Sequence, residues 1–523
     1  MMSADSARCA VPFPIPEAET GRAESPAPAV PAPEPSAVPV PSRRRWLAWG
    51  AAAWAAGCTG VTPNDASPAS GGATPAAAAE AAPGTTGSRT LASRATPVAE
   101  AAGWRVPADF EPARAIWIGW DEGHRDFSMA LARSIAPHAR VEVVARDPQA
   151  LEAARQALAP LAGSPAGGGP AVTAPAAPTG APRPGIGFHL IPEALYFVRD
   201  GVVFTTGPQR ELGVVDFAWN DYGRPGWCRV RHPGPAEAEA ARACEGDSAR
   251  AQQHFDLALA RQLGARVFRS PLVAEGGGVE SNGQGLMIAN EALVRQRHPD
   301  ADFAELQRLY LQLPGVRKVI WLPAGLAQDP PLRATIVGQH VAWGTGGHTD
   351  EFVRFADART VLLAWPEDDE AARHPVARLN RVRMQRNFEI LSRATDLEGR
   401  PLRVLKLPLP RIVERRVFLS AASDPGWSQQ WSAAWFPARE GRREGDPVMQ
   451  VAITSTLNFV VANSLVLVPG YLEHGTPRAL HERMLRVLEQ AFPGRTIGFI
   501  DAIGANWVGG GPHCATLNEP RVA

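Results

Sequence analysis

The fold class follows from the sequence Ala-Ile-Trp-Ile-Gly-Trp at residues 115–120, a short apolar run that ends in glycine and tryptophan. Runs of this length that carry β-branched residues and end near Gly, Pro or Asp are typical of buried strands. Similar runs follow at residues 140–145, 202–205, 319–322, 360–365, 402–407, 458–461, 464–469 and 496–501. Between them, apolar side chains recur at helical spacing in residues 249–263, 302–312 and 478–491. Strands and helices thus alternate, which predicts an α/β architecture.

Composition and charge narrow the class of protein. The chain has 523 residues, of which 45% are apolar, so it can bury one large core or two ordinary ones. Its 53 basic and 53 acidic side chains cancel, which argues against nucleic acid or an anionic membrane surface as a partner. No G-x-G-x-x-G follows the first strand and no G-x-x-x-x-G-K-[ST] occurs, so no motif supports nucleotide binding.

The N-terminal part of the sequence has the pattern of an export signal. Residues 42–58 have the sequence SRRRWLAWGAAAWAAGC, in which a basic start precedes an uncharged apolar run that ends in small residues. The apolar run is shorter than the roughly 20 residues that a membrane-spanning helix needs. Arg43 and Arg44 resemble a twin-arginine signal, and the segment before Cys58 is similar to a lipoprotein box. We expect an exported protein, periplasmic or anchored to the membrane through a lipid on Cys58. An alanine-rich linker with a chance arginine triplet is the alternative.

Low-complexity segments set the expected domain boundaries. Residues 1–58 form the N-terminal extension and export signal, and residues 59–102 are predicted to be a disordered tether rich in Ala and Pro. Such a segment cannot bury enough apolar surface to offset the entropy of ordering it. Residues 103–523 are expected to form a single catalytic domain, with a disordered insertion at about residues 163–185.

Two glycine-rich loops carry the residues best suited to chemistry. Cys514 follows the sequence Gly-Gly-Gly-Pro-His at residues 509–513, and a thiol presented by such a loop can serve as a nucleophile. A lone cysteine is nevertheless more often a small buried hydrophobe. His348 and Asp350 follow Gly346 and Gly347, and residues i and i+2 of an extended segment face the same side. No second His/Cys cluster with ligand spacing completes a metal site, so we favour catalysis without a metal or an organic cofactor.

Three more polar side chains stand beside predicted strands. Asp200 precedes the run at 202–205, Glu275 stands before three glycines, and Asn458 begins the run at 458–461. Taken singly, each is ordinary, because such groups commonly form surface ion pairs or turns. Their combination with the two glycine-rich loops is more specific.

The ordered set of motifs resembles the agmatine deiminases and the bacterial peptidyl-arginine deiminases of the same wider family. The likeness runs from about residue 104 to residue 520 through YFVRD at 196–200, DFAWN at 216–220, EGG at 275–277, VIWLP at 319–323, GHTD at 347–350, NF at 458–459 and GGPHC at 510–514. The resemblance implies a five-bladed, pseudosymmetric α/β-propeller of the pentein type, with its active site on the central axis.

The resemblance also implies roles for individual residues. Cys514 is the expected nucleophile and His348 its acid/base partner, while Asp200 and Asp350 clamp the cationic guanidinium. Asn458 and Glu275 are expected to bind substrate. We also expect His348 and the bound cation together to favour the thiolate of Cys514.

The expected reaction is hydrolytic deimination through a covalent cysteine intermediate. The leading substrate is agmatine, which would give N-carbamoylputrescine and ammonia and place the protein in polyamine metabolism and putrescine biosynthesis. Residues 396–408 look more like the agmatine branch of the family. Arginine in peptides is the closest alternative. An exported protein that binds a guanidino compound or a polyamine without turnover is an alternative of another class.

The sequence says less about the pairing of the remaining cysteines and about the oligomeric state. Cys228 and Cys244 are candidates for a disulfide in an oxidising compartment, although sequence alone does not supply the geometry. The partner is expected to be a small guanidino molecule or an arginine peptide. No pattern in the sequence indicates the oligomeric state.

Overall fold

The computed structural model describes residue 96, residues 98–162, 185–232, residue 244, and residues 254–421 and 430–522. Three of the sequence predictions lie outside these residues. They are the export signal with Arg43 and Arg44, the lipidation site Cys58, and nearly all of the insertion at 163–185. Most of the predicted tether, residues 59–95, lies outside them as well.

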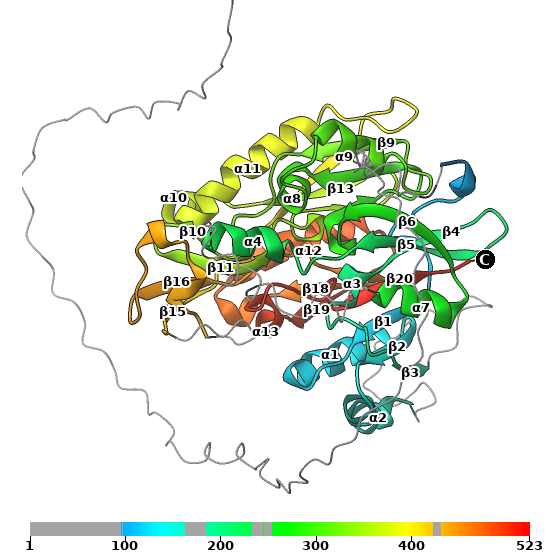
Figure 1. Ribbon diagram of the computed structural model, residues 1–523, viewed down its shortest axis with the longest axis horizontal. Coiled ribbons are helices and arrows are strands. Elements are labelled where there is room, and N and C mark those ends of the chain that lie inside the picture. Colours follow the sequence, from blue (N-terminus) through cyan, green and yellow to red (C-terminus); the bar gives the residue numbers. More distant parts are fainter. Residues whose placement is uncertain are drawn as a thin grey trace, which may run out of the picture. The chain divides into compact units, whose positions relative to one another are not determined.

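Within the described residues, five sheets share one strand pattern (Figure 1). In each, a short first strand pairs antiparallel with a middle strand, and the middle strand pairs parallel with the strand that follows it in sequence. One of the five carries an additional parallel strand at its edge. The five sheets are β20(Thr516–Pro520)-β1(Ala113–Gly119)-β2(Arg140–Ala145)-β3(Ile186–Leu190), β4(Val203–Thr206)-β5(Leu212–Ala218)-β6(Arg266–Val273), β7(Val279–Ser281)-β8(Leu286–Asn290)-β9(Lys318–Leu322), β12(Val353–Phe355)-β13(Thr360–Trp365)-β14(Arg403–Pro408) and β17(Val460–Ala462)-β18(Leu465–Gly470)-β19(Thr496–Asp501).

Helices connect the parallel strands of these sheets, since parallel neighbours need a long crossover connection. The connecting helices are α1(Arg125–Ile135), α2(Pro148–Ala162), α7(Phe255–Leu263), α8(Glu291–Arg297), α9(Phe303–Tyr310), α10(Asp368–Arg373), α11(Pro375–Leu391) and α12(Arg478–Ala491). In α12, Leu480, Met484, Leu488 and Ala491 are buried, which is the spacing of one helix face. Every residue of β13 is buried, as expected for a strand that is covered on both faces.

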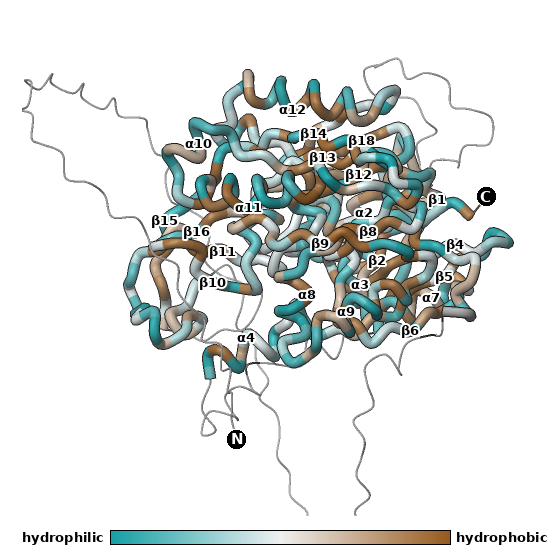
Figure 2. Tube along the Cα trace, turned by 90° about the horizontal axis from the view of Figure 1, so that it is seen from above, coloured by the Kyte–Doolittle hydropathy of each residue, from teal (hydrophilic) through white to brown (hydrophobic). Residues whose placement is uncertain are grey.

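A sixth sheet departs from the pattern. Its strands lie in the order β10(Pro331–Val337), β11(His340–Thr345), β16(Pro447–Val451) and β15(Glu414–Phe418). The short helices α3(Val198–Gly201) and α13(Ile503–Asn506) lie between the repeated units, and α4(Arg224–Arg231) precedes α7 in the connection from β5 to β6. Figure 2 shows apolar residues gathered on the central strands, such as β8 and β13, while α10, α11 and α12 alternate apolar and polar residues. No described helix has both the length and the apolar character to cross a membrane.

The expectation of alternating strands and helices is confirmed. The runs at 140–145, 360–365 and 496–501 are β2, β13 and β19, and the other six runs match strands to within about two residues at each end. The periodicity at 302–312 and 478–491 corresponds to α9 and α12, and the described part of 249–263 contains α7. The sequence analysis missed the sixth sheet, strands of the repeated sheets such as β3, β5, β8 and β20, and several helices, among them α1, α2, α8 and α11.

The structure pairs Cys228, on α4, with Cys244 in a disulfide, with their Cα atoms 5.9 Å apart. Cys228 is completely buried and belongs to the largest apolar cluster of the fold. The bridge therefore ties a buried side chain to a second segment 16 positions further along the chain.

Replacing both Cys228 and Cys244 with serine should lower the free energy of unfolding by about 3 kcal/mol, because a bridge over a loop of this length restricts the unfolded chain. Chemical denaturation of the variant and the parent checks the value. Counting free thiols before and after reduction checks the bridge itself. Two free thiols at these positions in unreduced, exported protein would contradict it.

Candidate active site

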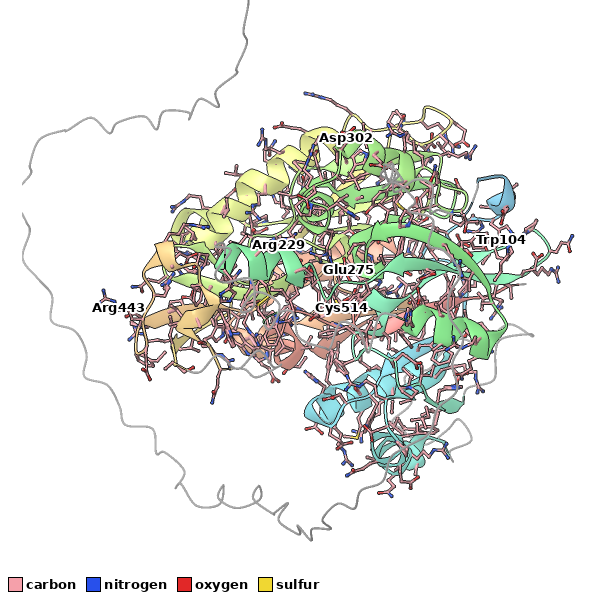
Figure 3. The ribbon with its side chains drawn as sticks, in the orientation of Figure 1. Trp104, Arg229, Glu275, Asp302, Arg443 and Cys514 are labelled. Atoms are coloured by element: carbon pink, nitrogen blue, oxygen red, sulfur yellow. A yellow bond between two sulfur atoms is a disulfide. The ribbon has the colours of Figure 1, made fainter. Side chains whose placement is uncertain are left out.

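One repeated feature of the fold brings the expected site residues together. The segment before the first strand of each of the five repeated sheets carries one or two of them: Asp200 before β4, Glu275 before β7, His348 and Asp350 before β12, Asn458 before β17, and Cys514 before β20. All six side chains are buried, with at most 3% of any residue exposed. Figure 3 shows Glu275 and Cys514 near the middle of the fold.

Glycine at position 277 leaves the space in which these side chains meet. A Cβ atom on Gly277 would lie 2.6 Å from Nδ1 of His348, 2.7 Å from Oδ1 of Asp200 and 3.0 Å from Oδ2 of Asp350. Its backbone N–H donates to Oδ1 of Asp200 over 3.2 Å. The glycines after Glu275 therefore reflect close approach of the backbone to the site.

His348 stands between carboxylates. Its Nδ1 lies 3.5 Å from Oδ1 of Asp200, and its Nε2 lies 3.5 Å from Oε2 of Glu275. Burial favours the neutral imidazole, but Asp200, Glu275 and Asp350 outweigh burial and raise the pKa of His348 to about 9. His348 is therefore protonated at neutral pH and can act as an acid.

The two carboxylates beside His348 differ in charge state because their other partners differ. Burial, reinforced by the charges of Asp350 and Glu275, raises the pKa of Asp200 to about 7. The hydroxyl of Tyr222 donates to Oδ2 of Asp200 over 2.9 Å. Burial also opposes the charge on Glu275, but Arg297 donates to it over 2.8 Å and helps to lower its pKa to about 2. Glu275 thus stays ionised, whereas Asp200 titrates near neutral pH.

Cys514 lies against an amide and a carboxylate. Nδ2 of Asn458 donates to its Sγ over 3.2 Å, and Sγ lies 3.5 Å from Oδ2 of Asp350. Burial and the charges of Asp350 and Asp200 raise the pKa of the Cys514 thiol well above its usual range. His348 lies beside Asp200 and Glu275, so burial and the neighbouring carboxylates set the pKa of Cys514. The expectation that His348 and a bound cation together favour the thiolate stays a prediction.

A buried carboxylate that the sequence analysis missed shapes the loop of His348. Asp329 accepts the backbone N–H groups of Gly347 over 3.0 Å and of His348 over 2.8 Å. The same loop needs positive φ angles, 104° at Gly346 and 100° at Gly347, which glycine adopts without strain. The GlyGly pair before His348 was visible in the sequence, but Asp329 had no neighbouring motif to mark it.

A second missed group supports Asp350. Nδ1 of His513 lies 2.7 Å from Oδ2 of Asp350, and its Nε2 lies 2.6 Å from Oδ2 of Asp109. Asp109 also accepts from Arg199 over 3.0 Å and from Arg354 over 2.9 Å, and these partners outweigh burial and hold its pKa well below the usual range. His513 adjoins Cys514 in the sequence, so its neighbourhood was a signal, whereas Asp109 is remote from every motif.

Some of the buried side chains of the site are also potential metal ligands. Asp350, Glu351 and Cys514 bring potential ligand atoms within 4.8 Å of one another. Burial, followed by the charges of neighbouring carboxylates, raises the pKa values of Glu351 and Cys514 well above their usual ranges, so both favour neutral forms that bind metals poorly. This part of the site is better suited to a cationic substrate that donates hydrogen bonds.

Several buried polar atoms of the site have no hydrogen-bond partner among the described residues. They are Nδ1 and Nε2 of His348, Oδ1 of Asp350, Oε2 of Glu275 and Oε2 of Glu351. Leaving a buried polar atom unpaired costs about 1–3 kcal/mol. Such a group of atoms is expected where a ligand completes the hydrogen bonding.

Similarity to known proteins agrees with this geometry. The family model described as Porphyromonas-type peptidyl-arginine deiminase matches residues 105–520. A protein of Streptomyces coelicolor, named provisionally as an agmatine deiminase, is 29% identical over 328 residues, which are 62% of this chain and 76% of that protein. The agmatine deiminase of Ectopseudomonas mendocina is 28% identical over 250 residues, which are 47% of this chain and 57% of that enzyme. The match thus spans little more than half of the length of the Ectopseudomonas enzyme.

Among solved structures, the agmatine deiminase of Enterococcus faecalis is similar with a TM-score of 0.57 and 21% identity. The similarity covers 82% of this chain and 98% of that enzyme. It establishes that this chain has the α/β fold of agmatine deiminases.

Fold and relatives agree on the class of protein. It is a hydrolase of carbon–nitrogen bonds that acts on guanidino groups. The chain belongs to the Porphyromonas-type peptidyl-arginine deiminase family, whose model spans most of its length.

Asp109→Asn should destabilise the fold by about 3 kcal/mol, because it removes the carboxylate that pairs with Arg199 and one of the two that pair with Arg354, which keeps Glu280. It should also lower kcat at least tenfold, since His513 loses the partner that orients it toward Asp350. Denaturation and steady-state kinetics measure the two effects. Asp121→Asn, which alters an exposed contact with His124, is the matched control and should change both by little. Equal behaviour of the two variants would contradict the role of Asp109.

Proposed function

We propose that this protein hydrolyses the guanidinium group of agmatine to N-carbamoylputrescine and ammonia through a covalent intermediate on Cys514. The observation that carries the proposal is the position of the buried Cys514 thiol, whose Sγ lies 3.5 Å from Oδ2 of Asp350 and whose pKa is raised by burial and by the charges of Asp350 and Asp200. These two carboxylates have the charge and the acceptor oxygens to bind a planar cation through charge-assisted hydrogen bonds.

Binding of the cation and activation of the nucleophile are then coupled. Burial opposes the thiolate of Cys514, and the charges of Asp350 and Asp200 add to that opposition. A guanidinium between these two carboxylates offsets the contribution of their charges, so the thiol releases its proton to solvent more readily once the substrate is bound. Sγ of Cys514 attacks the central carbon and forms the C–S bond. The C–N bond to the departing nitrogen breaks as His348, which is protonated at neutral pH, gives that nitrogen its proton.

The second half of the reaction returns the site to its first state. His348 is then neutral and takes a proton from a water molecule, whose oxygen attacks the same carbon. The C–S bond breaks, the proton left on the attacking oxygen returns to the sulfur, the ureido product leaves, and His348 is protonated again. Asn458, whose amide donates to Sγ over 3.2 Å, is placed to stabilise the charge on sulfur during both steps.

Two observations favour a small substrate over a peptide. The reactive side chains are at most 3% exposed, and the small cavity beside Tyr222 has a volume of about 10 Å³. Phe197, Tyr222 and Trp343 line this cavity together with Asp221 and Arg224. The curated relatives are named agmatine deiminases, whereas the family model carries the name of peptidyl-arginine deiminases. Peptidyl arginine therefore remains the second candidate substrate.

The arrangement of the sheets belongs to the same proposal. We propose that the five repeated sheets are the blades of a pentein-type propeller with the active site on its axis. The common strand pattern of the sheets supports this, as does the presence of a site residue before each first strand. The sixth sheet would then be an addition to the edge of the propeller.

We also propose that the protein acts outside the cytoplasm, anchored through Cys58 or free in the periplasm. The basic and apolar segment at 42–58 supports export, and the disulfide between Cys228 and Cys244 suits an oxidising compartment. A variant with Arg43→Lys and Arg44→Lys tests the export route, because it should retain the precursor in the cytoplasm.

A guanidino-binding protein without turnover would need the carboxylates but not the combination of Cys514 and His348.

Cys514→Ala should abolish turnover of agmatine while leaving binding intact, because the change removes the nucleophile and keeps the carboxylates. Ureido product is assayed with agmatine, free arginine and an arginine peptide, and binding of agmatine to the variant by calorimetry. The parent should prefer agmatine, and mass spectrometry should find the covalent adduct on Cys514. The variant that lacks Cys228 and Cys244 is the control and should retain activity. Turnover by Cys514→Ala within a few-fold of the parent would overturn the covalent mechanism.

The pH dependence of kcat/KM should be bell-shaped. The value should rise as pH passes about 7, where Asp200 loses its proton and can bind the cation. It should fall above about 9, where His348 loses the proton that it must give to ammonia. Because Asp200 and His348 interact, the two apparent pKa values of the profile describe the titration of the whole cluster and not of single residues. A profile that is flat between these values would contradict the assignment, and His474→Gln, a change on the surface, should leave both limbs in place.

A further inference from the structure

Three side chains form a cluster on the surface, away from the site of deimination. They are His340 at the start of β11, His374 directly before α11, and Glu414 at the start of β15. The three residues come from segments that are far apart in the sequence. β11 and β15 flank β16 in the sixth sheet, so the cluster joins this sheet to the beginning of α11.

The distances within the cluster match those between the ligands of a tetrahedral metal ion. Nε2 of His340 and Nε2 of His374 each lie 3.2 Å from Oε2 of Glu414. Zn²⁺ bonds of about 2.0–2.1 Å place neighbouring tetrahedral ligands about 3.3 Å apart. Charge-assisted hydrogen bonds are usually shorter, about 2.7–2.9 Å. Two imidazoles and one carboxylate are also a set of ligands that Zn²⁺ uses in proteins.

The surroundings of His340 prepare it to bind a metal. Its Nδ1 lies 3.2 Å from the backbone carbonyl of Val337, which can accept the ring proton and leave the lone pair on Nε2. Histidine ligands of metals commonly donate their second ring N–H in this way. The His340 and His374 rings stand 5.0 Å apart at an angle of 73°, so they approach Glu414 from different directions.

His374 has a second role that metal binding would change. Its Nδ1 accepts the backbone N–H of Val376 over 3.2 Å and caps α11. Coordination through Nε2 moves the ring proton to Nδ1, so this long contact is given up. One weak cap contact is small beside a metal–imidazole bond, and the helix also begins with Pro375, which needs no N–H partner.

Charge and access also suit a cation. Among the described residues, Glu414 has no ion pair with lysine or arginine, since the nearby Arg411 pairs with Asp369 and Glu370. About 18% of each imidazole side chain and 30% of the carboxylate side chain are exposed. Solvent can therefore supply the fourth ligand.

We propose that His340, His374 and Glu414 form a zinc site that fastens the start of α11 to the sixth sheet. Nothing in the reaction at Cys514 depends on it, so the site is structural. Ligands of this type also bind Ni²⁺ and Cu²⁺, and Cu²⁺ is expected to bind more tightly than Zn²⁺.

Calorimetric titration with Zn²⁺ tests the proposal on the full chain without a histidine tag. Reactive thiols are first alkylated, because Cys514 with Asp350 and Glu351 forms another group of potential ligands. One site with a micromolar dissociation constant is expected at pH 7.5, and at least tenfold weaker binding at pH 5.5, because protons compete with metal ions for ligand atoms. Zn²⁺ should also raise the Tm, and a chelator should reverse the rise.

Variants distinguish this site from incidental binding. His340→Gln and Glu414→Gln should each weaken Zn²⁺ binding at least tenfold. His374→Asn should do the same while retaining a side-chain oxygen that can cap the helix, which separates loss of the ligand from loss of the cap. His474→Gln is the matched control, because His474 forms an exposed pair with Asp501 at 3.0 Å. Unchanged affinity in the three cluster variants, or no binding by the parent, would overturn the proposal.

Discussion

The burial of several carboxylates in one small volume is the constraint on which the rest of the structure depends. Each negative charge there must be neutralised, paired or protonated, because an isolated charge in an apolar interior is very unfavourable. Arg297 pairs with Glu275, and His348 takes a proton between Glu275 and Asp200. Glu351 is driven toward its neutral form by burial and by the carboxylates around it. Asp200, with a pKa of about 7, has no arginine partner among the described residues.

The fold meets this constraint by distributing the charges over separate chain segments. Each segment that precedes a first strand contributes one or two side chains, so no single loop has to hold several carboxylates against their repulsion. Arginines on neighbouring elements provide compensation, as Arg199 and Arg354 do for Asp109. The site therefore depends on contacts between distant segments, which explains why support comes from residues that are remote in the sequence.

The difference between local patterns and contacts of distant segments also determines which features of the fold and the site can be predicted from the sequence. The strands that follow apolar runs, and the glycine loops before His348 and Cys514, are local patterns and were predictable. Asp109 and Asp329 could not be found, because their roles consist of contacts with loops far along the chain. The raised pKa of the Cys514 thiol could not be predicted from the sequence for the same reason. The order of residues in the sequence does not show whether the Cys514 thiol lies beside His348 or beside Asp350. Only the folded structure shows that it lies beside Asp350. The sixth sheet was missed because its strands lack the uninterrupted apolar character of the inner ones.

The electrostatics of the site, combined with the proposed reaction, give a reason for turnover as well as for binding. A guanidinium supplies the positive charge that the carboxylates lack, and it lowers the cost of a thiolate at Cys514 in the same event. The ureido group of the product is neutral and offers neither benefit, so its formation restores the raised thiol pKa and the partly protonated Asp200. A neutral amide would meet a protonated, weakly nucleophilic thiol. Selection for a cationic substrate thus lies in the nucleophile itself.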